Sequence, residues 1–345
     1  GEASRTKPMW SKMSNRLTIL IIINFGILCT GILGVINKNK HQDQPVVQAP
    51  VDEWSVIPIE EKPDLNYDIS SPVPAYKDND GTWDQLQEWH EEAPELTEIG
   101  TYGTSTKGRE IHFIKIENPY EDAEKPVVLI TACLHGNEPL SSSTVMGYIG
   151  TILDSYGDDK EITELVNSRI IYFVPVVSPD SYPHSRHVDG VDPNRNWPGP
   201  RSNKQSVKPV HELQSFFNKI KPNAVISGHT WGRIYLTPFG DRNQLCPNDA
   251  DYQRIIGEMG RLSKYKMQRA CQMYGRPIYG TEVDWYYRHG AFSIVMEFGT
   301  HQRVPSQSDI NTEFNRTFKA ALHFIKEAPV VEIKQYAVEE WLKAA

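Results

Sequence analysis

A histidine and a glutamate three residues apart follow one of the most apolar stretches of the chain. Residues 127–134 are apolar apart from one threonine, and His135 and Glu138 come directly after them. An apolar run of this length is typical of a buried strand, and Gly136 allows a turn in which the imidazole and the carboxylate converge. Such a pair can supply two of the three protein ligands of a catalytic zinc ion. The alternative is a surface histidine and glutamate in a loop between a strand and a helix.

Two further apolar segments carry a titratable residue at or near their end. Residues 224–228 lead into His229, and residues 293–296 lead into Glu297. A single charge in an apolar run costs free energy unless it is paired or used in chemistry. Together with the first pair, these residues form a candidate set of three zinc ligands and one base.

A loop rich in proline, glycine and asparagine lies between the first two segments and contains Arg186, Asn194 and Arg195. An adjacent asparagine and arginine can grip a carboxylate from two sides, because the guanidinium offers a fork of donors and the amide offers another. The alternative is a structural arginine that pairs with Asp189 or Asp192.

In this order, the motifs resemble those of the zinc metallocarboxypeptidases of the carboxypeptidase A type. The matching pieces are His135-Gly136-Asn137-Glu138, residues 192–196, Ser227-Gly228-His229, Asp284-Trp285 and Met296-Glu297-Phe298, with an opening at residues 82–111. The resemblance extends from about residue 80 to about residue 328 and covers none of the first 75 residues.

The resemblance implies a role for each residue that would take part in the chemistry. His135, Glu138 and His229 match the ligands of one zinc ion per chain. Glu297 matches the general base that activates the zinc-bound water and then protonates the leaving amine. Arg186 matches the arginine that polarises the scissile carbonyl and stabilises the oxyanion.

Substrate binding is implied in the same way. Asn194 and Arg195 match the pair that holds the terminal carboxylate of a peptide. The mobile tyrosine of the family is assigned to Tyr274 with a two-residue insertion, and Tyr279 or a merely structural tyrosine is the alternative. Val283 falls where the family lines its side-chain pocket, and an apolar residue there argues against selection for basic termini.

The predicted fold is an α/β domain with a mixed, mostly parallel sheet of the eight-stranded type and helices on both faces. Helices are expected at about residues 140–154, 208–220, 248–264 and 309–327, and strands are expected to end at residues 135, 178, 229 and 298. The zinc would then lie at the carboxyl edge of the sheet, where α/β proteins place their sites.

Residues 17–36 contain no charged side chain and predict a transmembrane helix. Twenty residues in a helix span about 30 Å, which is enough to cross a bilayer core. Basic residues flank the segment, four before it and two after it: Arg5, Lys7, Lys12, Arg16, Lys38 and Lys40. This bias predicts a cytoplasmic N-terminus and an exported C-terminal part. A cleaved signal peptide is the alternative, although its apolar core is usually shorter.

The predicted organisation has five parts. They are a cytoplasmic basic tail (1–16), a transmembrane signal-anchor helix (17–36), a proline-rich stalk (37–78), a catalytic domain (79–330) and a C-terminal tail (331–345). A net charge of −8 gives no reason to expect a nucleic-acid partner.

The function predicted from these features is that of a membrane-anchored zinc carboxypeptidase acting outside the cytoplasm. Its partner would be a peptide with a free C-terminal carboxylate, and the stem peptides of a bacterial cell wall are the first natural substrate to test. One alternative is a zinc deacylase or amidase of the same clan, acting on N-acyl amino acids or γ-glutamyl linkages. A second alternative is a non-catalytic binding module.

Overall fold

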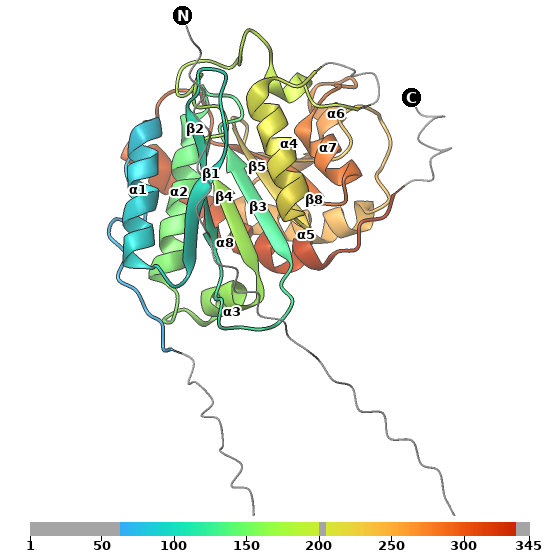
Figure 1. Ribbon diagram of the computed structural model, residues 1–345. Helices are drawn as coiled ribbons and strands as arrows, with labels where there is room; N and C mark the ends of the chain where they lie inside the picture. The colour runs from blue at the N-terminus through green and yellow to red at the C-terminus, as the bar shows by residue number, and fades with distance from the viewer. Residues whose placement is uncertain (1–62, 200–204, 336–345) are drawn as a thin grey trace, which may run out of the picture. The chain divides into compact units, whose positions relative to one another are not determined.

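A computed structural model describes residues 63–199 and 205–335, which form a mixed eight-stranded sheet in the order β1-β2-β4-β3-β5-β8-β6-β7 (Figure 1). The strands are β1 Thr97–Thr104, β2 Glu110–Ile116, β3 Val127–Ala132, β4 Ile170–Val174, β5 Ala224–Thr230, β6 Ile234–Thr237, β7 Lys266–Arg269 and β8 Phe292–Phe298. Four pairings between these strands are parallel and three are antiparallel. The predicted mixed, mostly parallel sheet is therefore confirmed.

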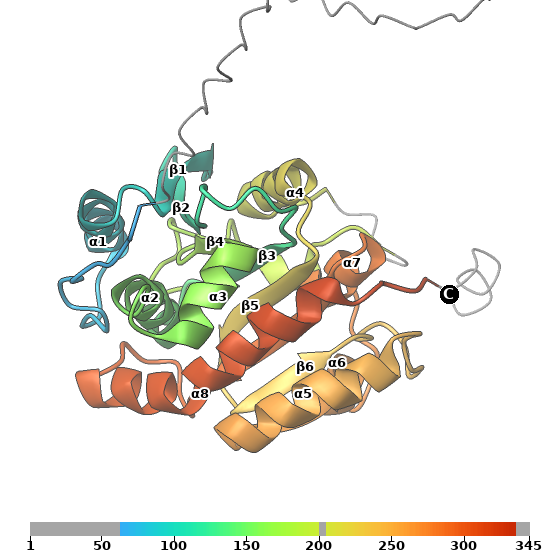
Figure 2. The same ribbon diagram turned by 90° about the horizontal axis from the view of Figure 1, so that it is seen from below.

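Helices cover both faces of this sheet (Figure 2). The helices are α1 Asn79–Glu92, α2 Pro139–Asp154, α3 Lys160–Ser168, α4 Lys208–Ile220, α5 Asp249–Ser263, α6 Ala270–Met273, α7 Glu282–Arg288 and α8 Gln307–Glu327, with 3-10 turns at Pro193–Arg195 and Ala328–Val330. Residues of α1, α2, α3, α5 and α8 share one apolar cluster with the sheet, and residues of α4 and α7 share another. The prediction of helices on both faces is confirmed.

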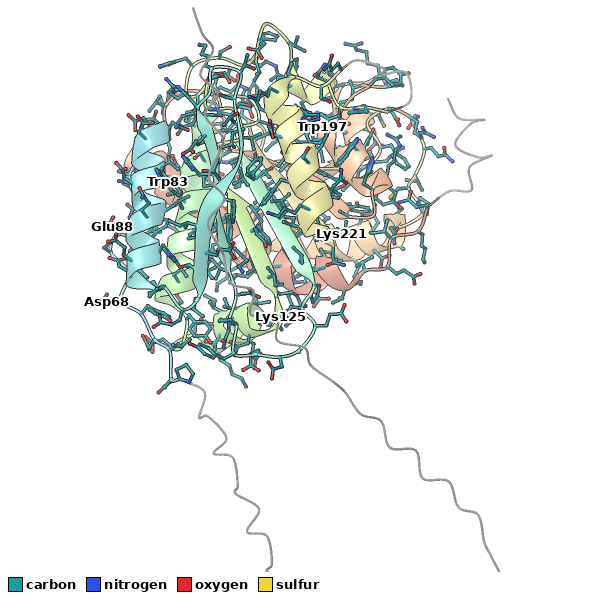
Figure 3. The ribbon with its side chains drawn as sticks, in the orientation of Figure 1. Asp68, Trp83, Glu88, Lys125, Trp197 and Lys221 are labelled. Carbon is teal, nitrogen blue, oxygen red and sulfur yellow. The ribbon has the colours of Figure 1, made fainter. Side chains whose placement is uncertain are left out.

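Helix α4 shows how the sequence pattern produces this packing. Val210, Leu213 and Phe217 recur at helical spacing and are all buried, so one apolar stripe faces the sheet. Trp197 lies beside α4 (Figure 3) and belongs to the same apolar cluster. The centroid of its ring lies 5.2 Å from that of Trp285 on α7. The loop that carries the candidate asparagine–arginine pair is thereby attached to the core.

The predicted helices agree with α2, α4, α5 and α8 to within two residues at each end. Two strands end earlier than predicted. Strand β3 ends at Ala132 instead of residue 135, and β4 ends at Val174 instead of residue 178. Cys133 has a φ of 53°, so the backbone leaves the extended conformation there and His135 lies on a loop.

Residues 63–78 belong to the packed domain, which corrects the prediction of a stalk for this part of the chain. Ile69 is buried in the core, and its backbone N–H donates to Asp154 Oδ1 of α2 at 3.2 Å. A Cβ atom on Gly150 would lie 2.4 Å from the Pro72 carbonyl oxygen, so this contact with α2 requires glycine. Proline content alone did not distinguish an extended stalk from an extended segment that lies against a helix.

No helix within residues 63–199 and 205–335 has both the length and the apolar character needed to cross a membrane. The predicted basic tail and transmembrane segment, residues 1–36, lie outside the described residues, as do residues 37–62 of the predicted stalk and residues 336–345 of the tail.

Candidate metal centre and substrate cavity

The three candidate metal ligands meet where the adjacent parallel strands β3 and β5 end. His135 follows β3, Glu138 is the N-cap residue of α2, and His229 is the penultimate residue of β5. His135 Nδ1 lies 3.0 Å from Glu138 Oε1, and His229 Nδ1 lies 2.9 Å from Glu138 Oε2. Ligand atoms of the three buried residues all fall within 4.8 Å of one another. The structure thus brings the whole predicted ligand set together.

Each histidine has a second carboxylate at its other ring nitrogen. His135 Nε2 lies 2.9 Å from Asp192 Oδ1, and His229 Nε2 lies 2.5 Å from Glu282 Oε1. When each Nε2–H donates to its carboxylate, both Nδ1 lone pairs face Glu138. Carboxylates in this position orient histidine ligands in metal sites.

The electrostatics of these groups favour a bound cation. Burial alone would raise the pKa of Glu138, but His229 and His135 outweigh it and lower the pKa to about 2. Burial would likewise lower the pKa of His229, but Glu138 and Glu282 reverse this and raise it well above its ordinary value. The imidazole of His229 lies between the carboxylates of Glu138 and Glu282, and this negative surrounding favours a positive charge at the ring. Two imidazole nitrogens and a carboxylate are the donor set of a catalytic zinc with three protein ligands, so these residues fit zinc.

Glu297 faces the same centre from β8, directly beside His229 on β5. Burial raises the pKa of Glu297 to about 7, against the opposing effect of His229. Its Oε2 atom is buried and accepts no hydrogen bond from any described residue. Glu297 therefore has a carboxylate oxygen available for a proton.

A cavity of about 360 Å³ opens over these residues. Its lining comprises His135, Glu138, Arg186, Asn194, His229, Thr230, Trp231, Gly232, Ile234, Lys266, Gln268, Met273, Tyr274, Glu297 and Gln302. Seven of the eight predicted site residues line it, and Arg195 lies beside it, where its guanidinium stands 5.1 Å from the centre of the Tyr274 ring.

Arg186 lines the cavity and is also an ion-pair partner. Its Nε and Nη2 atoms donate to Asp192 Oδ2 at 3.2 and 3.0 Å, and its Nη1 atom lies 3.7 Å from Glu138 Oε1. The structural ion pair with Asp192 is therefore present, and it holds the guanidinium at the edge of the cavity.

Asn194 is oriented by a backbone contact. Its Oδ1 atom accepts the Glu282 N–H at 2.9 Å, so its amide NH₂ is left as a donor group at the cavity. Arg195 Nη1 donates to the Asn194 carbonyl oxygen at 2.7 Å. Of the two candidate tyrosines, Tyr274 lines the cavity and is 41% exposed, whereas Tyr279 is half-buried and is not among the described lining residues.

An apolar cluster adjoins the cavity through Ile234, which belongs to both. Its members are Ile234, Leu236, Ala270, Ile278, Val283 and Val295. Val283 is 2% exposed within this cluster. The predicted side-chain pocket position thus has apolar surroundings.

Two polar residues whose side chains contact the candidate metal ligands lie outside the motifs found in the sequence. Glu282 contacts His229, and Gln302 Nε2 donates to Glu138 Oε1 at 3.1 Å and to the Thr230 carbonyl oxygen at 3.0 Å. Each is a single polar residue next to a turn, with no spacing pattern that relates it to a histidine or glutamate far away in the chain.

Residues 83–320 match the family model described as zinc carboxypeptidase, and the chain therefore belongs to that family. Mouse carboxypeptidase A2 is 26% identical over 263 residues, which cover 61% of this chain and 61% of that enzyme. The alignment thus spans about three fifths of the relative's length. The resemblance to zinc metallocarboxypeptidases is confirmed, and zinc is the metal of this family.

Solved structures agree on the fold. A thrombin activatable fibrinolysis inhibitor superposes with a TM-score of 0.69 at 18% identity, covering 75% of this chain and 76% of that chain. The carboxypeptidase A from Helicoverpa armigera has a TM-score of 0.63 at 18% identity and covers 74% of each chain. At these identities the comparison establishes the fold alone.

Proposed function

We propose that this chain is a zinc-dependent carboxypeptidase that hydrolyses the C-terminal amide bond of peptides. The observation that carries the proposal is the presence, in one cavity, of a buried three-residue metal centre, the unpaired carboxylate oxygen of Glu297 and the oriented amide of Asn194. A module that only binds peptides would need no buried base beside its metal centre.

Zinc held by His135, Glu138 and His229 would lower the pKa of a water molecule to about 7 and so make it nucleophilic at neutral pH. Glu297 accepts a proton from the attacking water and later donates it to the leaving amine. Arg186 donates hydrogen bonds to the carbonyl oxygen of the scissile bond as negative charge develops there. All of these residues line the same cavity.

The terminal carboxylate of the substrate is bound by the Asn194 amide and the Arg195 guanidinium, and Tyr274 covers it from the cavity wall. The side chain of the terminal residue is directed to the apolar cluster that contains Val283. Burial of an apolar side chain there contributes about 25 cal/mol per Å². We therefore propose a preference for apolar C-terminal residues.

The test uses the full chain and four kinds of substrate: free-acid peptides, their C-terminal amides, N-acyl amino acids and the stem peptides of a bacterial cell wall. Metal analysis should find one zinc ion per chain, and mass spectrometry should show release of single C-terminal residues from free acids. His229→Ala should lose the zinc ion, and the release of C-terminal residues should stop as a result.

Two results would overturn the proposal. Absence of bound zinc would reject the metal centre, and cleavage of N-acyl amino acids in preference to peptides would favour the deacylase or amidase alternative. The stem peptides test the natural substrate within the carboxypeptidase class, because they too present a free carboxylate.

We also propose that residues 17–36 anchor the chain in a membrane, with the N-terminus in the cytoplasm and the catalytic part outside it. The support is the uncharged twenty-residue segment and the excess of basic residues before it. Fractionation of cells that express the full chain tests this location, together with protease treatment of intact cells. Recovery in the soluble fraction, or protection of the catalytic part from protease outside the cell, would overturn it.

A further inference from the structure

Glu282 is a completely buried carboxylate that faces a candidate metal ligand. It is the first residue of α7, its exposed fraction is 0%, and its Oε1 atom lies 2.5 Å from His229 Nε2. Its Oε2 atom is buried and accepts no hydrogen bond from the described residues. The imidazole of His229 is therefore its main polar contact.

A buried carboxylate needs a compensating positive charge, because removal from water costs several kcal/mol. Within residues 63–199 and 205–335, no lysine or arginine forms an ion pair with Glu282. The only ion pair of Glu282 in this part of the chain is with His229. The compensating charge for this carboxylate therefore has to act through His229, either on the ring itself or from a cation at the metal centre beyond it.

His135 and His229 differ in how the negative charge of their carboxylate partner is compensated. Asp192, which contacts His135, also accepts hydrogen bonds from the Arg186 guanidinium and from the Asn194 N–H at 2.9 Å. Its negative charge is already shared with a cation. The carboxylate of Glu282 has no such partner, so its whole effect acts on the ring of His229.

Glu282 also has a second connection to the cavity, through its backbone. Its N–H donates to Asn194 Oδ1 at 2.9 Å. One residue thus contacts a metal ligand with its side chain and a substrate-binding amide with its main chain. A side-chain substitution would disturb the first contact and leave the donor of the second contact in place.

We infer that Glu282 is a positioning residue for the metal centre: it fixes the orientation of the His229 ring and strengthens the binding of zinc at Nδ1. A carboxylate that accepts the outer N–H of a ligating histidine raises the basicity of the other nitrogen, and loss of such a partner weakens metal binding by about 10- to 100-fold. This inference rests on the proposed function, because it requires zinc at the three ligands.

The test compares the parent chain, Glu282→Gln, Glu282→Asp and Glu313→Gln, each loaded with zinc. Glu313 is the matched control, since it is a buried carboxylate that pairs with Arg233 and contacts none of the three ligands. The measurement is the rate at which zinc is lost to an excess of chelator. Only molecules that carry zinc contribute to this rate, so a fraction of misfolded, zinc-free protein does not change the measured value.

Glu282→Gln should lose zinc about 10- to 100-fold faster than the parent, because the amide accepts the imidazole N–H without a negative charge. Glu282→Asp should also lose zinc faster, since its carboxylate is one methylene shorter and stands farther from the ring. Glu313→Gln should stay within about threefold of the parent.

A second readout separates positioning from a general structural role. Zinc-saturated Glu282→Gln should keep the ratio of free-acid to amidated peptide cleavage within about twofold of the parent, because the backbone donor to Asn194 is unchanged. Collapse of this ratio, an unchanged rate of zinc loss, or an equal acceleration in Glu313→Gln would each overturn the inference. A parent chain without zinc would overturn the proposed function as well, whereas normal zinc binding with an unaffected Glu282→Gln would reject only the role of Glu282.

Discussion

His229 and Glu297 stand directly opposite one another in the parallel pairing of β5 and β8. Side chains of residues paired in this way project from the same face of a sheet, so strand register alone brings the candidate metal ligand beside the candidate base. A shift of one residue in β8 would send Glu297 to the opposite face. The register of two central strands is therefore a requirement of the proposed chemistry.

Glu297→Gln should retain zinc and lose hydrolysis, because an amide cannot take a proton from the attacking water. The expected fall in kcat is about 10²- to 10⁴-fold, the usual contribution of a general base. Steady-state kinetics and metal analysis of the same preparation check this. Activity within tenfold of the parent would reject Glu297 as the base.

Amidation of a peptide's C-terminus should lower kcat/KM, because the Arg195 guanidinium and the Asn194 amide would lose their ionic partner. The fall should correspond to a loss of several kcal/mol of transition-state stabilisation. Arg195→Ala should narrow the difference between free and amidated substrates. Arg276→Ala serves as the control, since this exposed arginine is not among the described residues that line the cavity. Equal cleavage of both substrate forms by the parent would indicate that the pair binds a different group.

Peptides that end in leucine or phenylalanine should be cleaved faster than peptides that end in lysine or arginine. The six side chains of the cluster around Val283 are apolar and cannot pair with a buried ammonium. The nearby carboxylate of Asp284 already accepts the backbone N–H groups of Gly240 and Asp241. An unpaired buried charge costs several kcal/mol. Comparison of kcat/KM across such a series measures the preference. Val283→Asp should reduce the difference and Val283→Ile should not. A parent enzyme that prefers basic ends would contradict this prediction.

Ile69→Ala should lower the free energy of unfolding by about 2–5 kcal/mol, because it removes a core side chain and leaves a cavity. Ile69 is 3% exposed, although the segment that contains it looks like a linker in the sequence. Urea denaturation measures the change. The neighbouring exposed residue Asp68 provides the control (Figure 3), and Asp68→Ala should stay within about 0.5 kcal/mol of the parent. Equal values for the two variants would mean that this segment does not contribute to the core.

Asp284→Asn should become more stable relative to the parent as the pH rises. Burial, followed by the nearby Asp241, raises the pKa of Asp284 to about 6. The folded parent therefore binds this proton more tightly than the unfolded chain does, and its free energy of unfolding falls as the pH increases from about 4 to above 6. The free energy involved is on the order of a few kcal/mol, because one pKa unit corresponds to about 1.4 kcal/mol. The asparagine side chain of Asp284→Asn carries no charge at these pH values, so the stability of the variant lacks this pH dependence.

Denaturation curves at pH 4 and pH 7 should show this change in the difference between Asp284→Asn and the parent. The exposed carboxylate of Glu110 gives a control, because Glu110→Gln removes a charge that is not buried. If the free energies of unfolding of Asp284→Asn and the parent differ by the same amount at both pH values, the raised pKa of Asp284 would be contradicted.

The amino-acid sequence by itself determined the class of fold, the boundaries of four of the eight described α-helices and the three candidate metal ligands. These features depend on local patterns: apolar runs for buried strands, helical spacing in segments such as α4, and titratable residues at the ends of strands. Physical chemistry restricts such patterns strongly, because charges at the ends of apolar runs are costly unless they are used. The family motifs then related the separate pieces to one another.

Tertiary structure alone decided which residues support those ligands and where the domain begins. Glu282 contacts His229 across 53 positions of sequence, and Gln302 contacts Glu138 across 164. Residues 63–78 are proline-containing and partly polar, and their place in the core depends on a close approach that Gly150 permits. A contact between distant single residues leaves no periodic trace in the chain, since it is specified by the path of the backbone and the packing of everything between them.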